Sequence, residues 1–344
     1  MGRSQATNRS SARSNSPKLP AEGNFERLSE SSIRIGISAC LLGCKVRYDG
    51  DHKEDRFITH TLGTYFEWIP VCPEVELGLG TPRETMHLEM IRGTRRLIMP
   101  ESGRDLTEEM HNFSERRVDG LGTEELSGYI LKSSSPSCGM EGVRVHNPGR
   151  MTARSGRGIF AEALLARFPN LPVIEEDRLC DPRTRDNWIE RVFAFRRLRM
   201  LWSSRWKLRS LIEFHTAHKL TLLAHAPRAY RSLGQLVACG AELPKQALRT
   251  SYEEEFMQTL SIVAARGRHV NVLQHMAGYL RNQLDGAARI ELQEGIEEYR
   301  KGFVPLIVPL TLLKHHVRRL NVAYLAGQVY LNPHPVELAL RNCI

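Results

Sequence analysis

The sequence predicts an α/β fold with a Rossmann-like parallel sheet flanked by helices, followed by a C-terminal all-α domain. Short apolar strand signals alternate with helical patterns in the first half of the 344 residues, which is typical of a mostly parallel sheet. From about residue 187 onward, long helical patterns dominate and strand signals nearly vanish. We therefore expect a disordered basic tail over 1–32, an α/β domain over 33–186 and a helical domain over 187–344.

Four strands and two helices are predicted in the α/β domain. The first three strands are short and apolar, and each runs into a cysteine motif. Thr107 is expected to cap the first helix, because its hydroxyl can accept a hydrogen bond from a free N–H of the first turn. The strands are expected at 33–37, 67–71, 129–132 and 171–174, and the helices at about 107–126 and 159–168.

The second domain is expected to contain only helices. Apolar residues recur at the helical period through most of it, and glycine is sparse inside these segments. No internal repeat of useful length is present. The helices are expected at roughly 187–201, 205–224, 226–239, 251–265, 268–284, 286–301 and 309–320.

The composition is that of a globular protein with an excess of basic residues. The net charge of +9 and the pI near 9.3 favour an anionic partner. The seven cysteines do not follow the spacing of a disulfide scaffold. Residues 1–32 lack the apolar core of a secretory signal, and no window approaches the ~18 apolar residues that span a bilayer. We expect a cytoplasmic protein with reduced thiols and no membrane segment.

Cys40, Cys72 and Cys138 follow the first three predicted strands, and Gly, Pro or Ser residues flank each of them. The ligand crevice of a parallel sheet lies beyond the carboxyl ends of its strands. We therefore expect the three thiols to share one site. Three thiolates in such a site suit a [4Fe–4S] cluster whose fourth iron stays free for a substrate.

Other interpretations of the cysteines have to be weighed against a cluster. Free cysteines are often buried and structural, and we expect this of Cys180, Cys239 and Cys343, which no polar motif surrounds. A structural zinc site usually contains C-x2-C pairs, which are missing here. Cys40 and Cys44 form a C-x3-C pair, but without a following C-x2-C they do not complete a radical SAM motif. Cys44 is expected to be a bystander.

Charged and hydroxyl side chains lie close to the three cysteines in the sequence. Arg47 is a candidate anion binder and Asp49 a candidate acid or base, and an Asp–Gly turn with a solvated arginine is the alternative. Glu74 follows the second cysteine closely, and Arg83 comes after it. Serine hydroxyls near the third cysteine can bind a substrate carbonyl or cap the following turn. These residues are Ser133, Ser134, Ser135 and Ser137.

Five segments of the first domain together form a specific pattern: 38–43, 46–50, 71–74, 82–83 and 132–139. In this order they resemble the thiouracil desulfidase family, over residues 33–180 or so. The resemblance implies a [4Fe–4S] cluster held by Cys40, Cys72 and Cys138, with the fourth iron open. It also implies an enzyme that removes sulfur from a thiolated pyrimidine without redox chemistry.

The resemblance further implies roles for individual residues. The open iron would polarise the thiocarbonyl, a carboxylate would activate water for addition to the ring carbon, and the sulfur would leave as sulfide. The family uses an acid near the second cysteine and a serine near the third. Ser135 fits the serine, and Glu74 is the first choice for the acid, with Glu67 and Asp49 as alternatives. The expected substrate-binding residues are Arg47, Arg83 and Ser137.

The segments 214–219, 223–225 and 233–234, together with Tyr230, resemble a second, uncharacterised helical domain that is often fused to the first. This resemblance implies a fold and no mechanism. His215, His218 and His225 fall on one side of a helix. Hydrogen bonds between helices are the favoured explanation for them, ahead of an anion site or a metal site.

The segment 196–231 is strongly basic, with nine Lys or Arg residues and one acid, Glu213. Trp202 and Trp206 are interleaved with the basic residues. Basic residues with exposed aromatics are typical of a surface that holds a nucleic-acid backbone and stacks its bases. Tryptophans four residues apart also fit a core stripe between helices.

Three functions therefore compete. The first is an iron–sulfur-dependent desulfidase, an enzyme acting on 2-thiouracil or a similar free thio-nucleobase. The second is a nucleic-acid-binding protein that acts on or senses thiolated nucleotides in RNA through its basic helical domain. The third is a zinc-stabilised interaction protein without catalysis. Metal content separates the first from the third, and a salt-sensitive affinity for RNA marks the second.

Overall fold

The computed structural model describes residues 32–147, 153–338 and 340–342. From Ser32 onward the chain forms one compact unit. Apart from Ser32, the predicted tail over 1–32 lies outside the described residues. In the part of the chain that is described, no helix is both long and apolar enough to cross a membrane.

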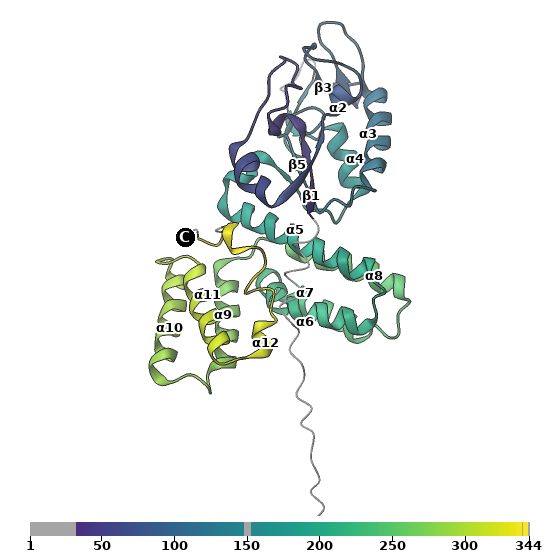
Figure 1. Ribbon diagram of the computed structural model, residues 1–344. Coiled ribbons are helices and arrows are strands. Elements are labelled where there is room, and N and C mark those ends of the chain that lie inside the picture. The colour runs from purple at the N-terminus through teal and green to yellow at the C-terminus, as the bar shows by residue number, and fades with distance from the viewer. Residues whose placement is uncertain (1–31, 148–152, 339, 343–344) are drawn as a thin grey trace, which may run out of the picture. The chain divides into compact units, whose positions relative to one another are not determined.

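Four parallel strands form the main sheet: β1 (Ile33–Ser38), β2 (Phe66–Val71), β5 (Gly128–Leu131) and β8 (Val173–Glu175). They are paired in the order β2–β1–β5–β8 (Figure 1). Ile35, Ile37 and Ile130 in the two central strands are fully buried, and strands covered on both faces consist of nearly continuous apolar runs. The predicted parallel sheet is confirmed, and its strands all end at one edge.

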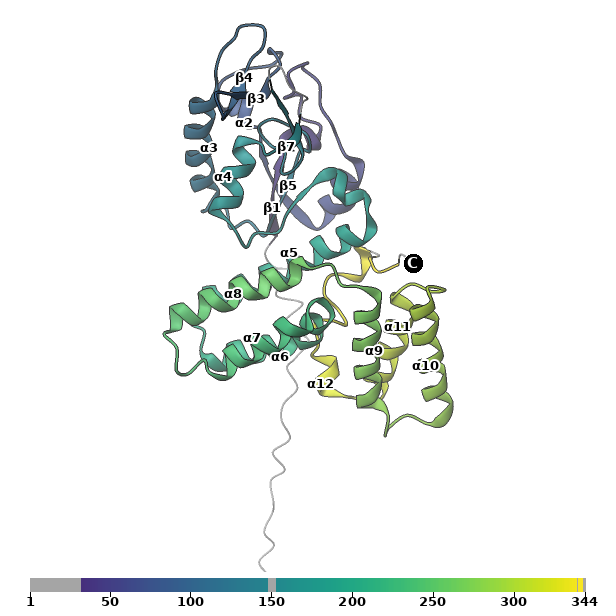
Figure 2. The ribbon, with the colours of Figure 1, turned by 180° about the vertical axis from the view of Figure 1, so that it is seen from behind.

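Two helices, α3 (Thr107–Leu121) and α4 (Ile159–Arg167), lie side by side along this sheet (Figure 2). The rings of Phe160 on α4 and Tyr129 on β5 lie 6.1 Å apart. The N-cap of α3 is Leu106, so the prediction of Thr107 was wrong. The Thr107 hydroxyl instead accepts a hydrogen bond of 2.8 Å from the backbone N–H of Leu97, and thereby fastens the start of the helix to a neighbouring strand.

No sequence pattern predicts the second sheet, which consists of β3 (His87–Ile91), β4 (Thr94–Ile98), β6 (Val143–His146) and β7 (Ala153–Gly156) in the order β4–β3–β6–β7. Leu88 and Leu97 point into a small core of their own, whereas the outer face carries charges. Such short strands with basic residues look like loops in a sequence. Arg92 and Gly93, both with positive φ, form the tight turn between β3 and β4.

Only helices and turns follow β8 among the described residues, as predicted. The boundary proposed at residue 186 falls inside the first of these helices. Figures 1 and 2 both show α9 (Arg266–Leu280), α10 (Gly286–Lys301) and α11 (Ile307–Arg319) next to one another, around a core that includes Leu273, Leu310 and Leu313. The helices are α5 (Pro182–Ser203), α6 (Leu208–His225), α7 (Pro227–Ala238), α8 (Lys245–Ser261), α9 (Arg266–Leu280), α10 (Gly286–Lys301), α11 (Ile307–Arg319) and α12 (Ala323–Ala326).

The helix α5 shares a core with the parallel sheet. Trp188, Val192 and Phe193 are buried together with residues of β1 and β5. The Trp188 indole donates a hydrogen bond of 2.9 Å to the carbonyl of Pro172, just before β8. Because this helix also packs against α8, it joins the sheet to the helices that follow.

Candidate active site

The three motif cysteines lie just beyond the carboxyl ends of three adjacent strands. Cys40 lies in the 3₁₀ turn η1 (Ala39–Leu42) directly after β1. Cys72 follows β2 and is the N-cap of the short helix α2 (Pro73–Glu76). Cys138 is buried in the loop that follows β5. Since β2, β1 and β5 are neighbours in one parallel sheet, the strand ends bring the three motifs together.

The three thiols influence one another electrostatically. Burial and the nearby Cys72 raise the pKa of the Cys40 thiol to about 11. Burial and the Glu74 carboxylate raise the pKa of Cys138 well above its usual range, and Cys40 and Cys72 add to this rise. Burial also raises the pKa of Cys72. Three thiolates at this site therefore need a positively charged group to hold them.

Glu74 is the carboxylate that faces this site. One carboxylate oxygen accepts a hydrogen bond of 2.5 Å from the Ser137 hydroxyl, and the other forms an ion pair with Arg83. The Arg83 side chain is only 3% exposed, and it also donates to the backbone carbonyls of Val46 and Gly80. Arg83 therefore holds Glu74 in place, and Ser137 links the carboxylate to the loop of the third cysteine.

Serine hydroxyls shape the loop that carries Cys138. The Ser135 hydroxyl lies 3.0 Å from that of Ser137 and accepts a hydrogen bond of 3.1 Å from the backbone N–H of Cys138. The loop rests on the N-terminus of α4, where backbone N–H groups donate to the carbonyls of Pro136 and Ser137. Gly158 caps this helix, and a Cβ there would lie 2.4 Å from the Ser137 carbonyl. A glycine is thus required for the close approach of loop and helix.

Arg47 and Asp49 form a salt bridge with each other at the rim of the site, with N–O distances of 3.2 and 3.1 Å. The hydrogen bond from Arg47 lowers the pKa of Asp49, which is exposed. Asp49 is therefore a carboxylate already paired with a guanidinium. Arg47 lies within electrostatic reach of Cys40. A hydrogen bond of 2.8 Å from the Arg83 N–H to the Tyr48 carbonyl places this segment beside Arg83.

Glu67 lies at the opposite end of its strand from the cysteines. It pairs with Arg34 near the start of β1, and its side chain is 40% exposed. Cys72 is five residues further along the chain, which corresponds to about 16 Å in an extended strand. Glu67 is thus too distant to act on a substrate bound at the three thiols.

Sequence reasoning did not assign a role to Lys132, Glu175 or Glu176. Lys132 forms an ion pair with Glu176, and its charge opposes the rise in the pKa of Cys40. Glu176 also accepts a hydrogen bond of 2.6 Å from the backbone N–H of Ser133. The buried Glu175 accepts one of 2.8 Å from the N–H of Met140, and burial raises its pKa. The two glutamates lie at the end of β8, which is a fourth strand end at the same edge of the sheet. This position in the sequence could have identified them as residues near the site.

The remaining cysteines differ from the prediction. Cys180 and Cys239 are exposed, so the expectation that they are buried was wrong. Cys180 is the last residue of a 3₁₀ turn, and Cys239 is the C-cap of α7. Both are exposed because the ends of helices usually lie at the surface. Cys343 lies outside the described residues. Cys44 is exposed, next to but not within the turn that carries Cys40.

The histidines and tryptophans of the helical part belong mainly to its core. His215 shares a hydrogen bond of 3.2 Å with the Tyr252 hydroxyl, and His225 donates one of 2.6 Å to the carbonyl of Ile262. Two of the three predicted interhelical bonds are thus confirmed, whereas His218 bonds to the Phe214 carbonyl of its own helix. The tryptophans Trp202 and Trp206 are buried, with rings 4.9 Å apart, so they are not exposed stacking platforms.

The cysteine site fits an iron–sulfur cluster by its donors. Within the described ranges, no group of three or more His, Cys, Asp or Glu side chains could hold a metal ion. A [4Fe–4S] cluster binds each protein ligand through a different iron, so its thiolates stand further apart than the ligands of one ion. Thiols are the donors that such clusters use, and the Ser137 hydroxyl lies 3.9 Å from the Cys138 sulfur.

Comparison with known proteins identifies two families in this chain. A family model described as 2-thiouracil desulfurase matches residues 35–176. A second model, described as a protein of unknown function (DUF1722), matches residues 219–335. The two matches fall on the part with the parallel sheet and on the helical part, respectively.

Individual relatives each match somewhat less than half of the chain. Escherichia coli (strain K12) YbgA, described as uncharacterized, is 31% identical over 161 residues, which are 46% of this chain and 94% of YbgA. Bacillus subtilis (strain 168) YbbK, also described as uncharacterized, is 29% identical over 153 residues, 43% of this chain and 98% of YbbK. A solved structure of a [4Fe–4S]-dependent thiouracil desulfidase, TudS, is 33% identical and covers 44% of this chain and 95% of its own, with a TM-score of 0.36.

Proposed function

The chain belongs to the 2-thiouracil desulfurase family through residues 35–176, and from this we propose that it replaces the sulfur of a thiolated pyrimidine by oxygen. One thiocarbonyl and one water give one carbonyl and one hydrogen sulfide, so the reaction needs no electron donor or acceptor. The substrate named by the family, 2-thiouracil, is the first compound to test. The activity and its cluster dependence are proposals for this chain.

Cys40, Cys72 and Cys138 would hold the [4Fe–4S] cluster that the name of the similar desulfidase TudS specifies for that protein. When bound, such a cluster supplies an iron that is a soft Lewis acid for the sulfur of a thiocarbonyl. The support from this chain is the placement of three thiols at neighbouring strand ends, together with their mutual electrostatic influence.

Glu74 is the proposed general base, and its pairing with Ser137 and Arg83 is the observation that carries the proposal. A carboxylate held by a buried arginine is fixed in its orientation, so it can take a proton from water as the water attacks the ring carbon. Asp49 is the weaker candidate for this role, since it lies exposed at the rim and, unlike Glu74, has no hydrogen bond from a hydroxyl among the described residues.

The hydroxyls of Ser135 and Ser137 are proposed to position the substrate. The two oxygens lie 3.0 Å apart, and that of Ser137 already donates to Glu74. Ser135 is therefore the donor between the two hydroxyls, and it would turn this proton from Ser137 to a ring carbonyl while its oxygen still accepts from the backbone N–H of Cys138. Arg47 and Arg83 would add positive charge where negative charge develops on the ring.

The experiment is an anaerobic assay of protein reconstituted with iron and sulfide, supplied with 2-thiouracil. Iron near four atoms per chain, with uracil and sulfide formed in equal amounts, is the expected result. Iron without turnover would contradict the choice of substrate. Zinc instead of iron, with no colour, would contradict the cluster and favour an interaction protein without catalysis.

The ligand set has a matched control within the chain. Cys40→Ala, Cys72→Ala and Cys138→Ala are each expected to abolish cluster assembly. Cys44→Ala removes an exposed thiol close to Cys40, and it is expected to leave the iron content unchanged. A colourless Cys44→Ala protein would show that Cys44 belongs to the ligands.

One observation supports a second function, action on thiolated nucleotides in RNA. Of the basic residues in 196–231, five are exposed: Arg205, Lys207, Arg209, Arg228 and Arg231. Exposed basic residues bind nucleic-acid backbones without sequence preference, and such binding weakens steeply as salt is added. A salt-sensitive affinity for thiolated RNA, with sulfide release from it, would favour this function. No affinity at low salt would remove its support.

A further inference from the structure

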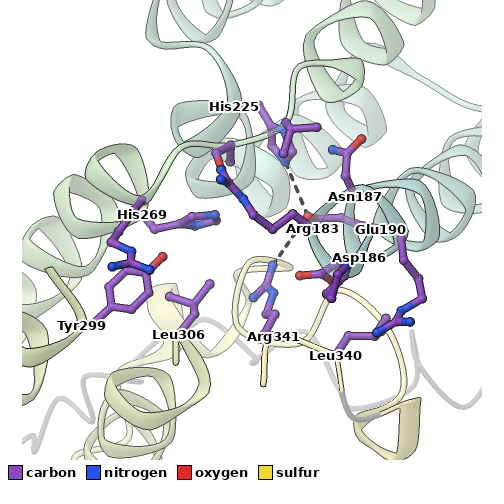
Figure 3. A pocket seen from close by; sticks show the side chains of 15 residues that line it. Arg183, Asp186, Asn187, Glu190, His225, His269, Tyr299, Leu306, Leu340 and Arg341 are labelled. Carbon is purple, nitrogen blue, oxygen red and sulfur yellow. Dashed lines mark hydrogen bonds and ion pairs between the residues drawn. The ribbon is translucent and has the colours of Figure 1, made fainter. Parts of the chain in front are cut away.

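A charged pocket of about 150 Å³ lies in the helical part, between α5, the start of α9 and the C-terminal segment around Arg341. Figure 3 shows Glu190 and Asp186 on one side of this pocket and His269 and Tyr299 on the other. All of its lining residues lie beyond residue 176, so the pocket belongs neither to the proposed active site nor to the matched desulfurase segment.

Of the two acidic side chains of the pocket, only Glu190 is paired with an arginine, among the described residues. Glu190 is buried, and it pairs with Arg341 at 3.3 Å and with His225 at 3.5 Å, as the dashed lines in Figure 3 mark. Asp186 lies 3.5 Å from His334 and makes no hydrogen bond through this oxygen within the described residues. A cation entering the pocket would have to compete with Arg341 and His225 for Glu190.

Three basic side chains of the same pocket form no ion pair with an acidic side chain among the described residues. Arg183 has a long hydrogen bond of 3.4 Å to the carbonyl of Ala264, and its charge helps to lower the pKa of Asp181. Arg185 donates to the Leu179 carbonyl at 3.3 Å and covers the ring of Phe57. Arg266 lies over the Tyr299 ring, with 5.6 Å between its guanidinium carbon and the ring centre. Guanidinium groups without carboxylates leave an excess of positive charge.

The Tyr299 hydroxyl lies where this positive charge gathers. Burial raises its pKa and the Asp186 carboxylate adds to that rise, whereas Arg266, Arg183 and Arg341 all oppose it, so three guanidiniums and one carboxylate act on the same oxygen. His269, on the same side, is held through its Nδ1 by the Tyr330 hydroxyl at 2.8 Å. Its Nε2 has no hydrogen-bond partner within the described part of the chain, and its ring points toward the middle of the pocket in Figure 3.

The backbone adds to this positive potential. Arg266 is the first residue of α9, a helix of 15 residues that no side chain caps and that has no acidic residue in its first turn. The N-terminus of a helix carries a partial positive charge and free N–H donors. Ala264, Arg266 and His269 all line the pocket, so this end of the helix faces it.

We propose that this pocket binds the phosphate group of a small ligand, either inorganic phosphate or a phosphomonoester, through Arg183, Arg266 and the Tyr299 hydroxyl. Several guanidiniums around one hydroxyl suit a tetrahedral dianion better than a single carboxylate, which one arginine would satisfy. The volume equals that of about five water molecules, which accommodates a phosphate group but is well below the pockets of drug-sized ligands.

The test is calorimetric titration of the full-length protein with sodium phosphate, and separately with glycerol 3-phosphate, at constant ionic strength set by sodium chloride. One phosphate is expected to bind per chain. Arg183→Gln and Arg266→Gln should each weaken binding about tenfold or more, because each removes a charge-assisted bond. Tyr299→Phe keeps the ring and should weaken binding less. Arg205→Gln, at an exposed arginine that is not among the residues lining the pocket, is the matched control and should bind like the wild type.

A second measurement guards against variants that fold poorly. Without phosphate, Arg266→Gln should unfold at a higher temperature than the wild type, since it relieves repulsion among guanidiniums. With phosphate, the wild type should gain more stability than Arg183→Gln or Arg266→Gln. Equal affinity in wild type, Arg183→Gln and Arg266→Gln would overturn the proposal, as would an equal gain with sodium chloride alone. Tighter binding of glycerol 3-phosphate than of phosphate would identify a phosphomonoester as the ligand, and the reverse would identify free phosphate.

Discussion

At the scale of single residues, the two oxygens of Glu74 have different partners. One oxygen accepts a hydrogen bond from the Ser137 hydroxyl, and the other forms an ion pair with the buried Arg83 guanidinium. A carboxylate with one hydroxyl and one guanidinium can exchange a proton on the hydroxyl side without losing its position. Asp49 has only the guanidinium of Arg47 and a backbone N–H, at an exposed site.

Glu74→Gln is therefore expected to keep the cluster and lose turnover. The amide fills the same volume but cannot accept a proton, and general base catalysis contributes about 10²-fold or more. The measurement is sulfide release from 2-thiouracil together with iron content. Asp49→Asn is the matched control and should retain activity. If Asp49→Asn were inactive and Glu74→Gln active, the two residues would have to exchange roles.

Buried histidines make the stability of the protein depend on pH. Burial lowers the pKa of His215 to about 4 and that of His218 to about 3, whereas an unfolded histidine has a pKa near 6.5. Between these values the unfolded chain binds more protons than the folded one. The stability that they contribute is therefore complete above about pH 6.5 and is lost as the pH falls toward 4.

The free energy of unfolding should consequently fall by up to about 1.4 kcal/mol per pH unit for each of these histidines between pH 6 and pH 4. Urea denaturation at several pH values measures this slope. In His218→Asn one proton-binding site is gone, so the slope should become shallower. An unchanged slope in this variant would mean that His218 is protonated in the folded protein.

At the scale of elements, the sequence was informative for the mostly apolar strands of the main sheet. The segments of β1, β2 and β5, and with them the three cysteine motifs, could be predicted because apolar runs end abruptly at Gly, Pro or Ser. The second sheet could not, since β4 and β6 carry arginines on an exposed face and are only four or five residues long. The ion pair between Glu74 and Arg83 could not be predicted either, because it depends on the tertiary contact between two loops.

The packing of the Cys138 loop on α4 depends on Gly158. A methyl group there would lie 2.4 Å from the Ser137 backbone, and overpacking of this kind typically costs about 1–3 kcal/mol. Gly158→Ala is expected to lower both thermal stability and cluster content. Gly278→Ala, inside α9 and with nothing within 4 Å, is the matched control and should be neutral or slightly stabilising. Normal iron content in Gly158→Ala would show that the loop can shift without harm.

At the scale of the whole molecule, α5 is the element that the parts share. Its Trp188 is buried with the parallel sheet, its Arg199 donates to the carbonyl of Leu126 at 2.7 Å, and its Glu190 lies among the later helices. Cutting the chain at residue 186 would remove these contacts from the sheet. Residues 33–186 alone should therefore be less stable than residues 33–203.

The buried group of Glu190, His225 and Arg341 ties α5 to α6 and to the C-terminal segment. Glu190→Gln would leave the Arg341 guanidinium buried without a counter-charge, which typically costs about 3–5 kcal/mol. Chemical denaturation is expected to show this loss. Glu213→Gln, which breaks an exposed pair with Arg209, is the control and should unfold like the wild type. Similar stability of the two variants would mean that water reaches the Glu190 group.

The different exposure of the thiols also offers a way to count clusters chemically. Cys44, Cys180 and Cys239 are open to solvent, whereas Cys40, Cys72 and Cys138 lie wholly or partly inside the sheet edge. Alkylating reagents should modify the three exposed cysteines whether or not the protein carries a cluster. The three cysteines of the site should become resistant to alkylation once iron binds their sulfurs. Mass spectrometry of alkylated peptides would then report the loaded fraction of a sample, site by site, without relying on colour or activity.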